Sequence, residues 1–247
     1  MRKAPRIAIP EPEFSDPEYN QRSWPQYAHA VEAAGGIAVK IPLSASPAEV
    51  AQLAASCEGV LLPGSGADVN PQKYGEEAIP ECGKADPARE AVDELLLQDA
   101  SNLQKPLLGI CYGFQSLNVW RGGTLIQDLQ TPIDHKPGRT VREAHSVKIK
   151  SASRLRTLLG TGSALTVNSS HHQAVKQAGD GLVPVAWSAE DGVIEAAEGR
   201  GEQFLVGVQW HPERFFDQDS ASNSLFQAFV SAAAAWEPRQ IRESVLD

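Results

Sequence analysis

Residues 106–117 read PLLGICYGFQSL and join a short apolar run to a segment with helical spacing. The apolar run is typical of a buried strand, and Gly109-x-Cys111-x-Gly113 turns directly into the helix. Such a turn holds a nucleophile clear of the sheet, and its small residues let strand and helix approach closely. A helix N-terminus also favours a thiolate over a thiol. Cys111 is therefore the first candidate for covalent chemistry, with a buried structural cysteine as the alternative.

A base for this nucleophile is found about a hundred residues further on, in the segment VQWHPE at 208–213. Pro212 disfavours helical geometry at His211, so we expect an extended tripeptide that places His211 and Glu213 on the same side. Glu213 can then hold the imidazole in the useful tautomer. Cys111, His211 and Glu213 together predict a nucleophile, a base and an orienting carboxylate.

Strands and helices alternate through the first half of the chain. We expect strands at 6–10, 37–41 and 59–62 and helices at 23–34, 46–56 and 86–103. This alternation predicts a parallel sheet that places its ligands at the carboxyl ends of the strands. In the helix at 86–103, we expect Arg89, Glu90 and Glu94 to form a solvated face.

The second half predicts antiparallel strands. These are a strand at 145–149 and a hairpin formed by 183–187 and 193–197. We also expect a short helix at 155–159 and a last helix at about 220–236. The polar tail from Glu237 is predicted to fray.

The composition bounds the class of protein. The 247 residues, 42% hydrophobic and 21% charged, are ordinary for one large α/β domain. A net charge of −9 argues against binding to nucleic acids or anionic membrane surfaces. Three cysteines without metal spacing, no signal-peptide pattern and no apolar stretch of membrane-spanning length predict reduced thiols in a cytoplasmic protein.

The adjacent histidines His171 and His172 raise the question of a metal site. Neither a carboxylate nor a cysteine stands at ligand spacing beside them, and neighbours on a strand point to opposite faces. We therefore expect no metal site here.

Four motifs carry a family resemblance: GICYGFQ, GGTLIQD, VNSSHHQAV and GVQWHPE, in that order. Together they resemble the class I glutamine amidotransferase family, and specifically its stand-alone branch that includes the γ-glutamyl-γ-aminobutyrate hydrolases. The resemblance implies a three-layer flavodoxin-like α/β sandwich with a mostly parallel central sheet, helices on both faces and additional antiparallel strands. It implies a single domain whose core spans about residues 6–236.

The resemblance also implies roles for individual residues. The backbone amides of Ser65 and Tyr112 would form the oxyanion hole. Tyr112 stands where relatives in the hydrolase branch often carry arginine, so this exchange bears on substrate preference. The remaining residues implied to bind the substrate are Gly64, Gln115, Ser169, Ser170 and His171.

The implied activity is hydrolysis of the γ-glutamyl amide bond of a small compound through a thioester, without cofactor or metal. Glutamate and an amine are released. The expected partners are the small-molecule substrate and, as one option, a second copy of the chain. A glutaminase subunit that passes ammonia to a separate synthase is the first alternative, and a binding protein that has lost activity is the second.

Overall fold

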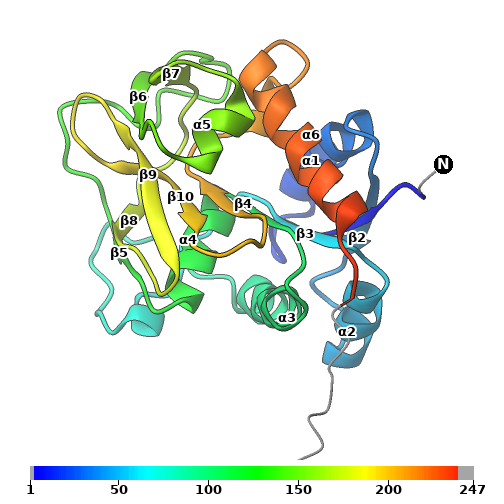
Figure 1. Ribbon diagram of the computed structural model, residues 1–247. Coiled ribbons are helices and arrows are strands. Elements are labelled where there is room, and N and C mark those ends of the chain that lie inside the picture. Colours follow the sequence, from blue (N-terminus) through cyan, green and yellow to red (C-terminus); the bar gives the residue numbers. More distant parts are fainter. Residues whose placement is uncertain (1–2, 239–247) are drawn as a thin grey trace, which may run out of the picture.

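The computed structural model describes residues 3–238, and one sheet of eleven strands runs through them (Figure 1). Five strands form its parallel half in the order β2-β1-β3-β4-β11. Their bounds are β1 Arg6–Pro10, β2 Ile37–Ile41, β3 Gly59–Leu62, β4 Leu107–Ile110 and β11 Leu205–Val208.

Antiparallel strands extend the sheet from β11 in the order β10-β9-β6-β7, and β8 joins β5 to β10. Their bounds are β5 Thr124–Ile126, β6 His145–Ile149, β7 Ala164–Val167, β8 Ala174–Gln177, β9 Leu182–Ser188 and β10 Ile194–Gly199. The predicted hairpin is present as β9 and β10.

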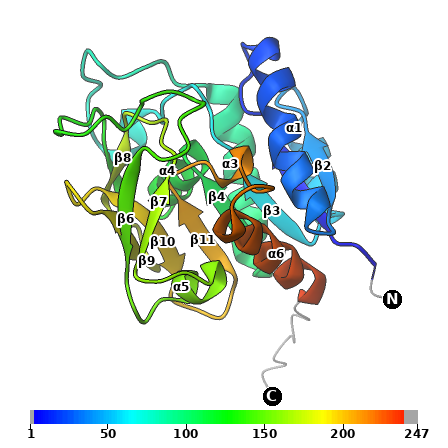
Figure 2. The same cartoon turned by 90° about the horizontal axis from the view of Figure 1, so that it is seen from above.

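Helices cover both faces of the sheet. On one face lie α1 (Pro17–Ala33), α5 (Arg154–Leu159) and α6 (Ser220–Ala235), and Figure 2 shows α1 and α6 side by side. On the other lie α2 (Pro47–Ala55), α3 (Pro87–Leu103) and α4 (Tyr112–Trp120). Each face has its own apolar core, one including Val31 and Phe226 and the other Leu96 and Phe114. The predicted three-layer architecture is confirmed.

The start of the first helix was predicted wrongly. Helix α1 begins at Pro17 instead of Ser23, because the Asp16 side chain caps it by accepting a 2.8 Å hydrogen bond from the Tyr19 amide. Pro25 therefore lies inside the helix. The start of the helix predicted at 46–56 agrees with the structure, in which Ser46 caps α2 and forms a capping box with Glu49.

The segment before β8 also departs from expectation. Strand β7 ends at Val167, so residues 168–173 form a loop rather than the rest of a strand, and the short β8 was not predicted. The predicted fraying of the tail falls largely on residues 239–247, outside the described part of the chain. Within residues 3–238, none of the helices combines the length and apolar character that a membrane span requires.

The junction of β4 and α4 is tightly constrained. Cys111 occupies a backbone conformation with φ 51° and ψ −108°, which is unusual for a residue with a side chain. A Cβ on Gly113 would lie 2.1 Å from the Leu62 carbonyl oxygen, and one on Gly109 would lie 2.8 Å from the Gly113 oxygen. Both glycines are therefore required for helix α4 to reach the end of β3.

We predict that Gly113→Ala destabilises the protein by about 3 kcal/mol, because the added methyl group meets the backbone of β3. Urea unfolding followed by circular dichroism measures this change. Gly162→Ala is the matched control, since an added Cβ there meets no atom within 4 Å, and it should shift stability by less than about 0.5 kcal/mol. Equal stability of the two variants would contradict the close approach.

Candidate functional site

The parallel strands β3, β4 and β11 end at the same edge of the sheet. Leu62 is in register with Gly109, and Val208 with Ile110. The Cys111 amide donates a 2.8 Å hydrogen bond to the Val208 carbonyl. The loop after β3, the nucleophile candidate after β4 and the HPE segment after β11 therefore meet at one place.

The His211–Glu213 pair forms in a way that the sequence analysis did not predict. Pro212–Arg214 is a short 3₁₀ helix, so the expected extended tripeptide is wrong. The turn nevertheless brings His211 Nδ1 to 2.8 Å from Glu213 Oε1, with both side chains buried. Proline suits the first position of such a turn because its missing N–H would be unpaired there.

Asn168 fixes the backbone of His211. The His211 amide donates to Asn168 Oδ1 at 2.9 Å, and Asn168 Nδ2 donates to the His211 carbonyl at 2.8 Å. Sequence reasoning missed this residue, although its position in the motif VNSSHHQAV was the available signal. Because one side-chain amide bonds both the N–H and the carbonyl of His211, it restricts the backbone conformation of this residue.

Cys111 and His211 both face one pocket of about 260 Å³. Gly64 lies against the two residues, since a Cβ there would be 2.9 Å from His211 Cε1 and 3.6 Å from Cys111 Cβ. His211 Nε2 is buried and has no hydrogen-bond partner among the described residues. The two side chains are thus neighbours in one pocket without a hydrogen bond between them.

Burial governs the ionisation of both groups. It raises the pKa of the Cys111 thiol to about 12, against the opposing effects of the Arg214 guanidinium and the Tyr112 backbone N–H. Burial likewise lowers the pKa of His211 to about 4, although Glu213 opposes the shift. The structure therefore corrects the expected resting thiolate: a thiol faces a neutral imidazole, because desolvation outweighs the helix N-terminus.

The two backbone amides expected to form an oxyanion hole lie at this pocket. The Gly64 amide is occupied, because it donates to the Tyr27 hydroxyl at 3.0 Å. By contrast, the Ser65 amide makes no hydrogen bond within residues 3–238. The Tyr112 amide faces the Cys111 sulfur, and both Ser65 and Tyr112 line the pocket. The Ser65 amide is therefore free for a ligand atom, whereas the Tyr112 amide is within hydrogen-bonding reach of the Cys111 sulfur.

Arg89 contacts the loop that follows β3. Its guanidinium is fully buried, donates to the Pro63 carbonyl at 2.6 Å and to Asp93 at 2.7 Å, and stacks on the Tyr112 ring at 4.7 Å. The prediction that Arg89 belongs to a solvated face is wrong.

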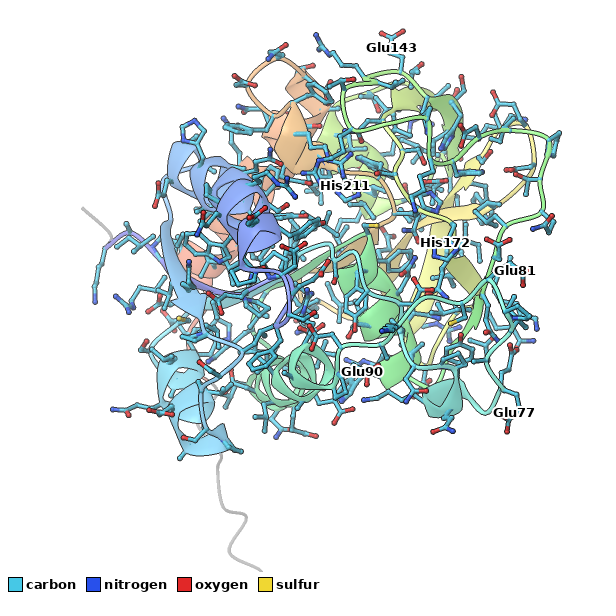
Figure 3. The ribbon with its side chains drawn as sticks, turned by 180° about the vertical axis from the view of Figure 1, so that it is seen from behind. Glu77, Glu81, Glu90, Glu143, His172 and His211 are labelled. Atoms are coloured by element: carbon cyan, nitrogen blue, oxygen red, sulfur yellow. The ribbon has the colours of Figure 1, made fainter. Side chains whose placement is uncertain are left out.

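The rest of that predicted face divides between buried and exposed residues. Glu90 is also buried, contrary to expectation, and accepts from the Asn70 amide at 2.8 Å (Figure 3). Only Glu94 is exposed as expected, and it pairs with Lys73. The Arg89 and Glu90 side chains face segments distant in sequence, which helical spacing alone does not reveal.

The predicted substrate contacts divide into two groups. Gln115, Ser170 and His171 line the pocket, and Gln115 Nε2 donates to the Gln173 carbonyl at 2.9 Å. Ser169 does not line the pocket, because it is fully buried and its hydroxyl donates to the His135 carbonyl at 2.7 Å. The structure thus brings three of these four residues to the pocket.

Three cations at the pocket were not predicted. Lys136 and Arg139 come from the loop before β6, and Arg214 follows Glu213 directly. The Arg214 side chain is 5% exposed and its Nε lies 3.7 Å from Glu213 Oε1, but Nε and Nη1 make no hydrogen bond to a described residue. The pocket can therefore receive an anionic group.

His172 lies on the same side of the molecule as His211. Figure 3 labels both residues near the middle of the view, whereas Glu77, Glu81 and Glu143 lie toward its rim. The ring of His172 contacts Asp68 at 3.0 Å and Asp128 at 3.1 Å, and the hydrogen bond to Asp68 raises its pKa.

Comparison with known proteins agrees with this arrangement. The chain matches the family Peptidase C26 over residues 11–213. A Mycobacterium tuberculosis protein described provisionally as a glutamine amidotransferase is 38% identical over 218 residues, which cover 87% of this chain and 68% of that protein. The γ-glutamyl-γ-aminobutyrate hydrolase PuuD of Escherichia coli K12 is 33% identical over 217 residues, covering 84% of each chain.

A solved structure shares the fold. A Thermoplasma acidophilum protein, described provisionally as one of the subunits of a GMP synthase, superposes with a TM-score of 0.64, covering 96% of this chain and 97% of that one. Its sequence identity of 14% supports the architecture alone. The chain belongs to the peptidase C26 family, among the class I glutamine amidotransferase-like proteins.

Proposed function

We propose that this protein is a cysteine-dependent hydrolase that cleaves the γ-glutamyl amide bond of a small γ-glutamyl compound. The observation that carries the proposal is the shared pocket of Cys111 and a Glu213-bound His211, which the residues Ser65 and Tyr112 also line. Family membership and the E. coli hydrolase relative support the same reaction class.

Because the Cys111 thiol and the His211 imidazole are both neutral at rest, the first step includes a proton transfer between them. As the Cys111 sulfur attacks the γ-carbonyl carbon, His211 Nε2 accepts the thiol proton, so no thiolate has to persist in the buried site. A small movement of either side chain is required, since the two are not hydrogen-bonded at rest. Glu213 stabilises the imidazolium that forms, through the existing bond to Nδ1.

The two backbone amides act on the carbonyl oxygen. The N–H groups of Ser65 and Tyr112 would donate hydrogen bonds to the negatively charged oxygen of the tetrahedral intermediate. The His211 imidazolium then gives its proton to the leaving amine, and a thioester remains on Cys111. Water attacks this thioester while His211 accepts one of its protons, and glutamate leaves with the thiol restored.

The charges of the pocket favour a substrate that carries more than one carboxylate. The buried guanidinium of Arg214 suits an anchoring carboxylate close to the reacting bond, while Lys136 and Arg139 can bind a second one nearer the rim. Gln115 can accept from the substrate ammonium through Oε1, because its Nε2 is already engaged. A γ-glutamyl-γ-aminobutyrate-like compound has this pattern of charges.

The competing proposal is a glutaminase subunit that supplies ammonia to a separate synthase. Glutamine has one carboxylate and leaves the rim cations without a partner. Glutamate release by the purified chain, compared between glutamine and γ-glutamyl-γ-aminobutyrate, separates the two. Faster turnover of glutamine, and only after a synthase is added, would favour the subunit.

We predict that Cys111→Ala lowers glutamate release from γ-glutamyl-γ-aminobutyrate by at least about 10³-fold, because no other sulfur lines the pocket among the described residues. A coupled glutamate assay measures the rate. Cys82→Ser is the control and should keep activity within about twofold. Retained turnover in Cys111→Ala would refute the covalent route.

We predict that alkylation of Cys111 by iodoacetamide accelerates about tenfold per pH unit from pH 7 to 9, because only the thiolate reacts and burial raises the pKa of this thiol to about 12. The sign follows from the raised pKa, which keeps the thiol protonated at neutral pH. Mass spectrometry measures the rate, and Cys111→Ala corrects for Cys57 and Cys82. A plateau at or below pH 7 would instead indicate a resting thiolate–imidazolium pair.

We predict that Arg139→Gln raises KM for γ-glutamyl-γ-aminobutyrate about tenfold with little change in kcat, because a rim cation contributes equally to ground-state and transition-state binding. The KM for glutamine should change less than about twofold. Arg156→Gln on α5, outside the pocket, is the matched control. Equal effects on both substrates would place the second carboxylate elsewhere.

A further inference from the structure

Four buried side chains with metal-binding atoms converge beside the pocket. They are His135, His145, His171 and Glu195, and one ligand atom from each lies within 4.8 Å of all the others. They come from the loop before β6, the first residue of β6, the loop before β8, and β10. The proposed hydrolytic mechanism uses none of them.

In each histidine, the ring nitrogen that points away from Glu195 lies beside a hydrogen-bond acceptor. His135 Nε2 lies 2.9 Å from Asp191 Oδ2, and His171 Nδ1 lies 2.9 Å from the Gln173 carbonyl. His145 Nδ1 makes a longer contact of 3.4 Å with the Ser146 carbonyl. These partners accept hydrogen bonds, so the protons of neutral rings belong on those nitrogens. The opposite nitrogens then direct their lone pairs inward.

These inner atoms lack hydrogen-bond partners. His135 Nδ1, His145 Nε2, His171 Nε2 and both Glu195 oxygens are buried and unpaired among the described residues. Three lone pairs facing a carboxylate in a dry interior would cost free energy, unless a positive charge lies between them.

The three distances from Glu195 are close to the edges of a tetrahedral metal centre, and the histidine nitrogens lie within 4.8 Å of one another. Glu195 Oε1 lies 3.5 Å from His135 Nδ1, 3.4 Å from His145 Nε2 and 3.7 Å from His171 Nε2. Zinc–ligand bonds of about 2.0–2.1 Å give a tetrahedron with edges of about 3.3–3.4 Å. A proton shared between one nitrogen and the carboxylate would instead bring that single pair to about 2.7–2.9 Å.

We propose that His135, His145, His171 and Glu195 bind a structural Zn²⁺. Three imidazoles and one carboxylate suit this ion, and the Asp191 and Gln173 partners resemble the outer hydrogen bonds that orient zinc-bound histidines elsewhere. Four protein ligands leave no position for a water, so the role assigned is structural.

The ion would hold together the segments that shape the pocket. The loop 168–173 already rests on His135, whose carbonyl accepts from the Ser169 hydroxyl and the His171 amide. That loop carries Asn168, which fixes His211, and Ser170, which lines the pocket. A zinc centre would thus position the pocket wall without contacting the substrate.

Spacing in the sequence gave no sign of this centre. The expectation of no metal site rested on the lack of a carboxylate or cysteine close to His171 and His172 along the chain. The His172 ring contacts Asp128 and Asp68 and lies outside the cluster. The residues that join His171 in the cluster come from β10, from the loop before β6 and from the first residue of β6.

The test measures metal in the untagged full-length chain, grown with zinc, dialysed and analysed by plasma mass spectrometry. About one zinc per chain is expected, falling at least tenfold in Glu195→Gln and His145→Ala. His172→Ala is the matched control, because it removes a neighbouring histidine outside the cluster, and should retain the wild-type content. Circular dichroism checks that each variant is folded.

A second readout uses the wild-type chain, so it holds if the variants fail to fold. Stripping with dipicolinate should lower Tm, and ZnCl₂ should restore it. Co²⁺ added to the stripped chain should give the strong visible absorption of tetrahedral cobalt. The proposal would be overturned if the wild-type protein contained no zinc, its Tm did not respond to Zn²⁺ and its spectrum did not respond to Co²⁺. Full zinc content in Glu195→Gln would also overturn it.

Discussion

The close approach of α4 to the end of β3 is the contact on which the site depends. Gly113 touches the Leu62 backbone, and this contact determines where the helix starts and forces Cys111 into its unusual backbone conformation. Ser65, which follows β3, and Tyr112, which opens α4, line the same pocket as Cys111. Backbone packing thus sets the geometry of the turn that carries the nucleophile candidate, and the Arg89 side chain holds the neighbouring loop through the Pro63 carbonyl.

Burial is the second constraint, and it acts against ionisation. The burial of Cys111 and His211 favours the neutral form of both, despite a nearby guanidinium and a carboxylate partner. In the proposed mechanism, charge separation therefore begins only when a substrate supplies the electrophile. The hydrogen bond between His211 and Glu213 is then in place before the imidazolium exists.

Local patterns predicted the parallel half of the fold well. The strands at Arg6–Pro10, Ile37–Ile41 and Gly59–Leu62 have short apolar runs with clear boundaries, and their bounds agree with the structure. The start of α1 was missed because Asp16 competes with Ser23 as a cap. Arg89 was misjudged because helical spacing reports the neighbours along one helix, whereas its partners Pro12 and Pro63 lie in other segments.

Site residues that belong to a short sequence motif could be predicted, whereas those that the fold brings together from distant segments could not. Cys111, His211 and Glu213 stand in short motifs with chemical meaning. The cations Lys136 and Arg139 sit in a loop without periodicity, and the cluster around Glu195 joins four distant segments. Contacts of that kind arise from the antiparallel strands, whose pairing leaves little trace in local sequence.

Strand β11 marks the boundary between the parallel and antiparallel halves of the sheet, and His211 follows directly after it. The candidate nucleophile, Gln115 and the amides of Ser65 and Tyr112 come from the parallel side, while Ser170, His171 and the loop with Lys136 and Arg139 belong to the antiparallel side. The wall of the pocket is therefore built by two halves of the sheet that meet at a single seam. Changes in the antiparallel half can alter that wall while the backbone around Cys111 stays the same.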